Sequence, residues 1–228
     1  MNLPIRRDIV AYVAPFVAYV VPTMFESKGW FVHQYEIVCT LKGLITAVAL
    51  WVFRRHYPPL ATKGFGLAIL VGAVGCLLWI LLDRLQAAIP GLQPFLNSVI
   101  GSRAGYDPFA SAGSATARAA FVIVRLIELA AIVPVMEELF WRGFLARYLL
   151  ADDFQNAPQG VFTPTSFVIV TLAFASVHPE ILAAIAWGML INLLYHRTAN
   201  LWACVVMHAV TNGFLGAYIL TTGNWQLW

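Results

Sequence analysis

Charged side chains are scarce in this sequence. Asp, Glu, Lys and Arg make up 11% of the 228 residues, whereas ~25% is usual in a soluble domain. Fourteen basic and eleven acidic residues leave a formal charge of +3, which is too small a surplus to indicate nucleic-acid binding. Because 61% of the residues are hydrophobic, the composition predicts an all-α integral membrane protein, folded as one polytopic domain over residues 1–228 in a lipid bilayer.

Several chemical signatures are missing as well. The three cysteines, Cys39, Cys76 and Cys204, lie far apart in apolar segments without C-x-x-C spacing. Neither a disulfide framework nor a cysteine metal site is therefore expected. No serine or cysteine occupies a nucleophile motif, which argues against a covalent intermediate. The H-E-x-x-H zinc motif is also absent, and the chain contains no internal repeat.

Long apolar segments predict a transmembrane bundle of about seven or eight helices. A bilayer core of ~30 Å needs about 20 apolar residues per helix. Spans are expected over about 9–25, 37–53, 64–82, 119–149 and 201–220. An interfacial helix with a loop is expected over about 83–117, and a loop over 151–165, which is rich in turn-forming residues. The chemistry-bearing core is expected over about 119–220.

The distribution of basic residues predicts the orientation in the membrane. With the N-terminus inside, the inner side collects Arg6, Arg7, Arg54, Arg55, Lys63, Arg147 and Arg197, and the outer side receives Lys28, Arg84, Arg103 and Arg118. Loops on the cytoplasmic side of a membrane protein carry an excess of Lys and Arg. This bias therefore predicts a multi-pass protein with a cytoplasmic N-terminus.

The segment 166–197 does not fit a simple count of spans. It is too short for two full-length helices joined by a turn and too long for one ordinary span. Pro179 follows His178 directly, and proline disfavours a helical predecessor and removes a backbone donor. We expect two helices of reduced length that meet near Pro179 and hold His178 at an inward-facing, hydrated break. The alternative is a single long, tilted helix kinked at the proline.

Three short motifs place polar side chains inside otherwise apolar segments. A charge at the bilayer centre costs at least ~2.5–3.5 kcal/mol, so such residues normally line an interior and mark a function. The motifs are Glu137-Glu138-x-x-x-Arg142, Phe174-x-x-x-His178 and His208-x-x-x-Asn212. Each pair is a weak signal by itself, but two carboxylates, two imidazoles and an amide together make a usable hydrolytic set.

The first motif predicts an ion pair beside a proton acceptor. Residues four apart share a helix face, so Glu138 is expected to pair with Arg142. Glu137 points about 100° away from Glu138 and need not share that partner. Two neighbouring carboxylates resist joint ionisation, and we interpret Glu137 as the general base and Glu138 as its orienting neighbour. The alternative is a structural ion network that also includes Arg125 and Glu128.

The two histidine motifs also have a chemical and a structural interpretation. Phe174 shares a face with His178 and is expected to shield its imidazole, although a lone histidine on an apolar helix is often a hydrogen-bonded core residue. His208 and Asn212 share a face, and both can donate hydrogen bonds to a developing oxyanion. The structural alternative for this pair is hydrogen bonding between helices.

These side chains allow hydrolysis of an amide by activated water. Glu137 would abstract the proton, His178 would position or polarise the water, and His208 and Asn212 would stabilise the oxyanion. No cofactor is required, although Glu137, His178 and His208 are the candidate ligands if zinc binds. One shared site requires that the His178 imidazole lie within about 3–6 Å of the Glu137 carboxylate, close enough for one bridging water.

At this point the residues resemble a known family. EELFWRG at 137–143, Phe174 with His178, YHRTANLW at 195–202, and His208 with Asn212 together resemble the CAAX protease and bacteriocin-processing (CPBP) family. This family includes the Ras-converting CAAX prenyl endopeptidases, and the resemblance covers about residues 122–212. The N-terminal half, with PF at 15–16 and LWVFRR at 50–55, is similar to a compact bacterial subfamily linked to the exosortase sorting system.

The resemblance implies an all-helical intramembrane endopeptidase of the bacterial inner membrane. It implies that Glu137 and His178 activate water and that His208 and Asn212 form the oxyanion site. The expected substrate is a membrane-anchored protein or peptide cut near its terminus. Membership of the family does not by itself imply that this substrate is prenylated. Two alternatives of other classes are a non-proteolytic scaffold or bacteriocin-immunity protein and, less favoured, a proton-coupled transporter.

Overall fold

The fold is all-helical wherever the computed structural model describes the chain, which is residues 7–26, 34–99, 101, 105–110 and 114–228. The helices are α1 (Arg7–Glu26), α2 (Tyr35–Phe53), α3 (Phe65–Ala88), α4 (Leu92–Val99), α5 (Ala115–Ile127), α6 (Val133–Glu138), α7 (Ala146–Tyr148), α8 (Pro164–Ala175), α9 (Ile181–Thr198) and α10 (Leu201–Thr222). Since α5 to α7 form one continuous helix, Ala115–Tyr148, the described chain contains eight helices, as predicted.

Among the described residues, five helices are long and apolar enough to cross a bilayer. They are Arg7–Glu26, Tyr35–His56, Phe65–Ala88, Ala115–Tyr148 and Leu201–Thr222, and they coincide with the five predicted spans. The predicted multi-pass integral membrane protein is thereby confirmed. The orientation stays a prediction, and three of the basic residues that it uses, Arg6, Lys28 and Arg103, lie outside the described residues.

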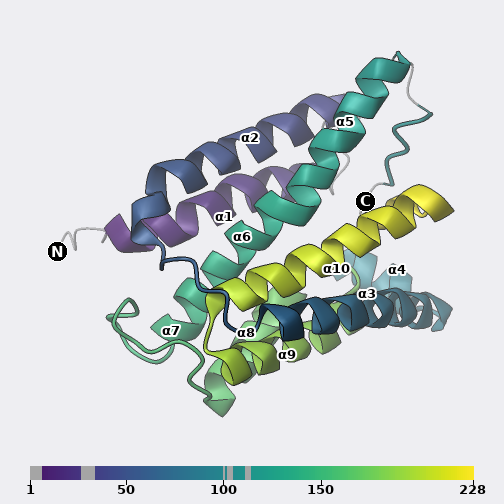
Figure 1. The fold of residues 1–228 in the computed structure, drawn as a ribbon. Helices are drawn as coiled ribbons and strands as arrows, with labels where there is room; N and C mark the ends of the chain where they lie inside the picture. Colours follow the sequence, from purple (N-terminus) through teal and green to yellow (C-terminus); the bar gives the residue numbers. More distant parts are fainter. Residues whose placement is uncertain (1–6, 27–33, 100, 102–104, 111–113) are drawn as a thin grey trace.

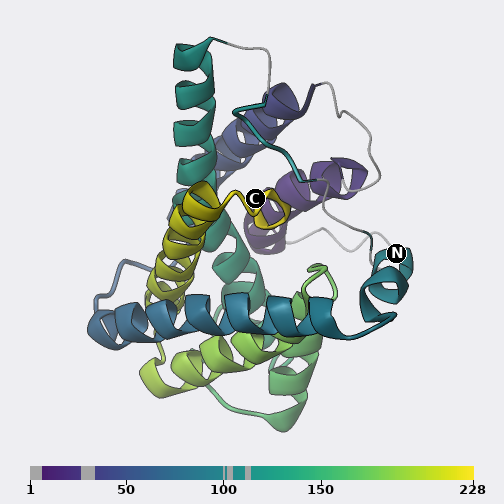
Figure 2. The ribbon, with the colours of Figure 1, turned by 90° about the vertical axis from the view of Figure 1, so that its right-hand side faces the viewer.

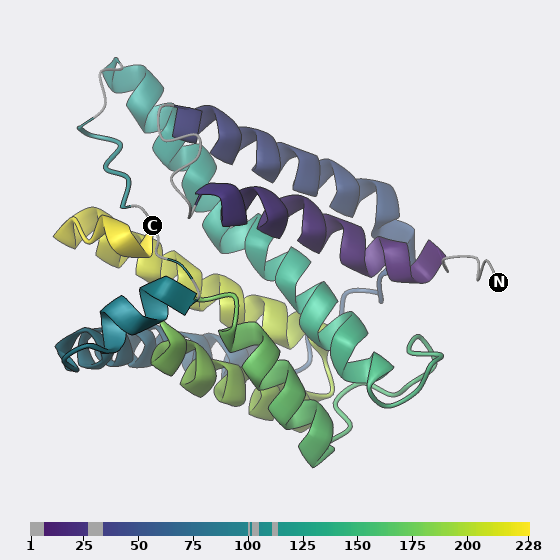
Figure 3. The same ribbon diagram turned by 180° about the vertical axis from the view of Figure 1, so that it is seen from behind.

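The helices form two groups about the long helix Ala115–Tyr148. Helices α1 and α2 pack against each other and against this helix on one side, and α3, α8, α9 and α10 gather on the other side (Figures 1 and 3). The short turn Trp225–Leu227, which follows α10, folds back toward α1 (Figure 2). The two groups therefore face each other across the segment that carries Glu137.

The long helix is not the uniform α-helix that the sequence suggested. Two stretches, Glu128–Ile132 and Leu139–Leu145, have π-helical hydrogen bonding and flank α6. Pro134 lies just after the first stretch and cannot donate to the preceding turn, which gives a physical reason for the widened turn there. Such turns change the direction of side chains and are frequent at functional sites.

The predicted break at Pro179 is present. Helix α8 ends at Ala175 and α9 begins at Ile181, so two shorter helices replace the single kinked helix that was the alternative. The buried side chain of Gln86 satisfies the open backbone: its Nε2 donates to the Pro179 carbonyl (2.9 Å) and its Oε1 accepts from the Leu182 N–H (3.1 Å). One amide from α3 therefore caps the start of α9 across the break.

Replacing Gln86 by Leu is expected to destabilise the protein. The Pro179 carbonyl and the Leu182 N–H would lose their partners, and each buried unsatisfied group costs about 1–3 kcal/mol. We expect a lower melting temperature in detergent, measured by thermal unfolding. Gln93→Leu is the matched control, because Gln93 bonds the side chains of Gln86 and Asn97 but not the break itself. Equal melting temperatures for the two variants would contradict the capping role.

Candidate active site

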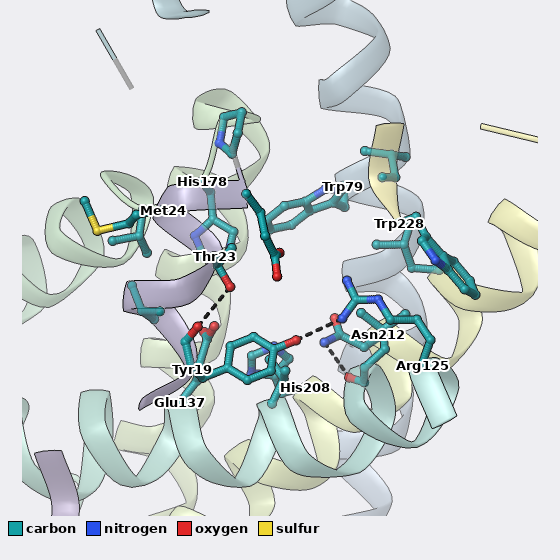
Figure 4. Close-up of a pocket in the computed structure, with 18 of the residues that line it drawn as sticks. Tyr19, Thr23, Met24, Trp79, Arg125, Glu137, His178, His208, Asn212 and Trp228 are labelled. Carbon is teal, nitrogen blue, oxygen red and sulfur yellow. Dashed lines mark hydrogen bonds between the residues drawn. The ribbon is translucent and has the colours of Figure 1, made fainter. Parts of the chain in front are cut away.

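A cavity of about 300 Å³ lies between the two groups of helices. Its wall includes Glu137, His178, His208 and Asn212, so the structure brings together the four predicted catalytic residues from three separate segments. Figure 4 shows these four side chains around the cavity. Phe174 also lines it, whereas Glu138 and Arg142 lie behind the wall. The predicted water-bridging separation of His178 and Glu137 stays a prediction.

Glu137 presents a carboxylate oxygen that no described residue bonds. The residue is 7% exposed, and its Oε2 atom has no hydrogen-bond partner among the residues that the structure describes. Buried polar atoms are nearly always bonded, so an unpartnered carboxylate oxygen at a cavity calls for an explanation. Glu137 as a whole lines the cavity, which places its carboxylate beside any water or substrate N–H bound there.

Glu138 holds two other side chains in place. Its carboxylate accepts hydrogen bonds from Arg142 Nη1 at 3.0 and 3.2 Å, as the four-residue spacing predicted, and from His208 Nδ1 at 2.8 Å. Glu138 and Arg142 are fully buried. Two cationic or donor partners compensate the charge of this carboxylate, which would otherwise be costly at this depth. Glu138 therefore orients His208, a contact that the sequence did not predict, and its role as the orienting neighbour of Glu137 stays a prediction.

The bond to Glu138 decides which nitrogen of His208 faces the cavity. An ionised carboxylate only accepts hydrogen bonds, so Nδ1 of His208 carries the hydrogen and Nε2 is left for the cavity. In the neutral ring, Nε2 is an acceptor. It becomes a donor to an oxyanion only when the ring also carries a hydrogen on Nε2. The predicted donor role therefore requires that His208 be charged during the reaction.

His178 lies in the break after α8 and is held by a carbonyl near the end of that helix and by aromatic rings. Its Nδ1 lies 2.8 Å from the Phe174 carbonyl, which can only accept, so Nε2 of the neutral ring is an acceptor. The Phe174 ring lies 4.3 Å from the imidazole between centroids, and the Trp79 ring lies at 5.6 Å. The predicted packing of Phe174 on His178 is confirmed.

Asn212 bonds the first π-helical stretch and lines the cavity as well. Its Nδ2 donates to the Leu129 carbonyl at 2.9 Å. Leu129 lies within Glu128–Ile132, where the widened turn changes the helical hydrogen bonding. A side-chain amide has two N–H groups, and one donor remains for a ligand after this bond. The structure thus gives Asn212 an interhelical bond without using all of its donor capacity.

The sequence did not predict a second group of polar and aromatic residues, of which Trp187 and Thr211 line the cavity and Asn192 and Thr171 lie outside its wall. Asn192 accepts from Arg142 Nε (3.2 Å) and donates to Thr171 (2.9 Å), which fixes the guanidinium that pairs with Glu138. Trp187 packs 4.7 Å from the His208 ring and donates to Thr211. Buried polar residues in the apolar segments 164–175 and 181–198 were the available signal for this group.

The four charged residues of the structural alternative form two ion pairs. Arg125 pairs with Glu128 (3.3 Å), and Glu138 pairs with Arg142 (3.0 Å), so the long helix carries two separate ion pairs. Arg125 lines the cavity while Arg142 does not. The two pairs therefore have different positions relative to the cavity, although both lie on one helix.

The described residues contain no group of side chains arranged as a set of zinc ligands. Within the described part of the chain, no three His, Cys, Asp or Glu side chains approach closely enough to share a metal ion. A zinc site normally needs three or four such ligands at about 2.0–2.3 Å. Glu137, His178 and His208 do not form such a group among the described residues, and zinc binding by them stays a prediction.

A comparison with known families matches the segment that contains the four candidate catalytic residues. Residues 119–214 match the family model described as type II CAAX prenyl endopeptidase Rce1-like. This match confirms, for that segment, the family that the motifs predicted. No curated protein and no solved structure matches the chain.

Proposed function

We propose that this protein is an intramembrane endopeptidase that hydrolyses a peptide bond in a membrane-anchored protein or peptide. The match of residues 119–214 supports a CAAX-type peptidase in general terms. The observation that supports the chemistry is the position of Glu137, which has an unpartnered carboxylate oxygen and lines one cavity together with His178, His208 and Asn212. A carboxylate, two imidazoles and an amide suffice for hydrolysis by activated water.

In this proposal Glu137 and His178 act on the attacking water. Glu137 takes one proton from the water as it adds to the carbonyl carbon, while Nε2 of His178 accepts a hydrogen bond from the second hydrogen of that water. The new C–O bond forms as the carbonyl π pair moves onto oxygen. Glu137 then gives its proton to the leaving amine as the C–N bond breaks, which returns the carboxylate to its starting state.

His208 and Asn212 would stabilise the negative charge on the oxygen of the tetrahedral intermediate. His208 would carry both ring hydrogens before the water attacks and keep them throughout, so that its Nε2–H and the remaining N–H of Asn212 donate to the oxyanion. Glu138 stabilises the imidazolium through Nδ1, and Arg142, held by Asn192, fixes Glu138. His208, Glu138, Arg142 and Asn192 are all buried. Charge-assisted hydrogen bonds are strong in such a low-dielectric environment. No metal or other cofactor takes part in the proposed steps.

Comparative proteomics of membranes tests the proposal. Membranes from cells with the wild-type protein and from cells with Glu137→Gln would be compared by mass spectrometry of protein termini. We expect one or a few membrane proteins to appear as uncleaved precursors only in the variant. Asp152→Asn, in the exposed loop after α7, is the control. Identical termini in all three membranes would contradict the endopeptidase and favour the scaffold or immunity protein.

A further inference from the structure

The cavity has a second polar end that the proposed chemistry does not use. Arg125 lines the same cavity as Glu137 and is 7% exposed. Lys42, which is also buried, lines this end as well and pairs with Glu26. Figure 4 shows Arg125 near Asn212, with the Tyr19 hydroxyl directed toward the guanidinium. A buried cation at membrane depth is costly, and it normally marks a function.

Arg125 is held firmly from one side. Its Nη1 donates to the Tyr19 hydroxyl (2.9 Å) and to Glu128 Oε2 (3.3 Å), and Cys39 Sγ donates to the same Glu128 oxygen (3.2 Å). Gly43 of α2 leaves room for this carboxylate, because an added Cβ would overlap Glu128 Oε1. Three helices, α1, α2 and α5, therefore fix the direction of one guanidinium.

The other edge of the guanidinium is not used by these bonds. Both involve Nη1, and the buried Nε atom has no hydrogen-bond partner among the described residues. The Trp228 ring lies over the guanidinium at 6.0 Å from its centroid and covers it from another direction. The Nε and Nη2 edge of an arginine matches the two oxygens of a carboxylate, which it binds with two parallel hydrogen bonds.

We propose that Arg125 forms a carboxylate subsite that positions the substrate for cleavage. This inference rests on the proposed endopeptidase function and adds a specificity-determining residue to it. The carboxylate is either the free C-terminus of the substrate or the side chain of an Asp or Glu near the cut. In both cases the carboxylate would accept hydrogen bonds from the N–H groups of Arg125 that the described contacts leave unused. Ionic hydrogen bonds are strong in such a low-dielectric cavity.

The long helix sets the distance between the two ends of the site. Arg125 and Glu137 lie on one continuous helix, twelve positions apart, which corresponds to at most about 18 Å along its axis at 1.5 Å per residue, because the π-helical stretch Glu128–Ile132 lies between them. An extended peptide advances about 3.3 Å per residue, so that distance spans about five residues. The scissile bond is therefore expected within about five residues of the bound carboxylate.

Matched peptides test the subsite independently of cleavage. Three fluorescent apolar decapeptides would be titrated by polarisation into the full chain with Glu137→Gln in detergent. One has a free C-terminal carboxylate, one has a single Glu and an amidated terminus, and one has Gln and an amidated terminus. We expect one of the first two to bind at least about tenfold more tightly than the third, since hydrogen bonds to charged groups are the stronger class. The tighter peptide identifies the source of the carboxylate.

The variants are chosen so that loss of folding does not obscure the result. Arg125→Gln combined with Glu128→Gln removes both charges of the pair together. Arg125→Lys keeps the positive charge but cannot donate two parallel hydrogen bonds to one carboxylate. Both are expected to lose most of the preference for the carboxylate. Arg118→Gln, two turns earlier on α5 and outside the cavity wall, is the control and should retain it. Equal binding of the three peptides, no binding of any, or a preference that survives in the double variant would overturn the subsite.

A cleavage assay separates the two proposals. The same peptides would be incubated with the wild-type chain, and the products would be sized by mass spectrometry. Arg125-dependent binding without cleavage would leave the subsite standing and count against the endopeptidase. Cleavage that ignores the carboxylate would support the endopeptidase and overturn the subsite. Loss of Arg125 should raise KM more than it lowers kcat, because the residue binds at a distance from the reacting atoms.

Discussion

Glu137→Gln is expected to reduce peptide hydrolysis by at least a hundredfold, since a positioned general base contributes about 10²–10⁴ in rate. The amide has nearly the shape of the carboxylate but cannot accept the proton from the attacking water. The change also removes a buried charge that has an unpartnered oxygen, so the folded yield and melting temperature should stay at or above the wild-type values. The measurement is the initial rate of product formation in proteoliposomes, with a melting curve of the same preparation.

Asp152→Asn removes a carboxylate from an exposed loop outside the cavity and is the matched control for this change. It should keep both the rate and the melting temperature of the wild type. A well-folded Glu137→Gln protein that retains the wild-type rate would remove Glu137 from the mechanism. The general base would then have to be sought elsewhere in the cavity.

Glu138→Ala is expected to have the largest effect on stability. It leaves Arg142 charged and fully buried without its ionic partner, and it removes the acceptor of His208 Nδ1. Breaking a buried ion pair from one side costs about 3–5 kcal/mol. At about 2–4 °C per kcal/mol for a chain of this length, the melting temperature should fall by roughly 6–20 °C. Thermal unfolding in detergent measures the shift, and hydrolysis should be lost as well.

A double variant separates stability from catalysis at this position. Glu138→Gln with Arg142→Gln removes both buried charges, so most of the lost stability should return. Activity should not return, because a neutral amide stabilises the His208 imidazolium far less than a carboxylate does. A stable, inactive Glu138→Ala protein would contradict this assignment, since it would give Glu138 a direct chemical role instead of the positioning role that its contacts indicate.

The sequence predicted the elements of the fold because lipid imposes strict local rules. Every backbone polar group in the bilayer must be satisfied within its own segment, so each long apolar run becomes a helix. The five spans and the break near Pro179 followed from these rules. The pairing of Glu138 with Arg142 followed from helical spacing alone. The packing of Phe174 on His178 was predicted as well, although α8 ends three residues before His178.

The sequence by itself thus determined which side chains were available for chemistry, because polar residues are conspicuous in apolar segments. Only the tertiary structure decided their partners. Glu138 bonds His208 across 70 positions of the chain, and Gln86 caps a helix that begins 95 positions later. No local pattern encodes such contacts, because they depend on how helices pack and on where the π-helical turns redirect side chains. The position of Arg125 in the wall of the same cavity as Glu137 was decided in the same way.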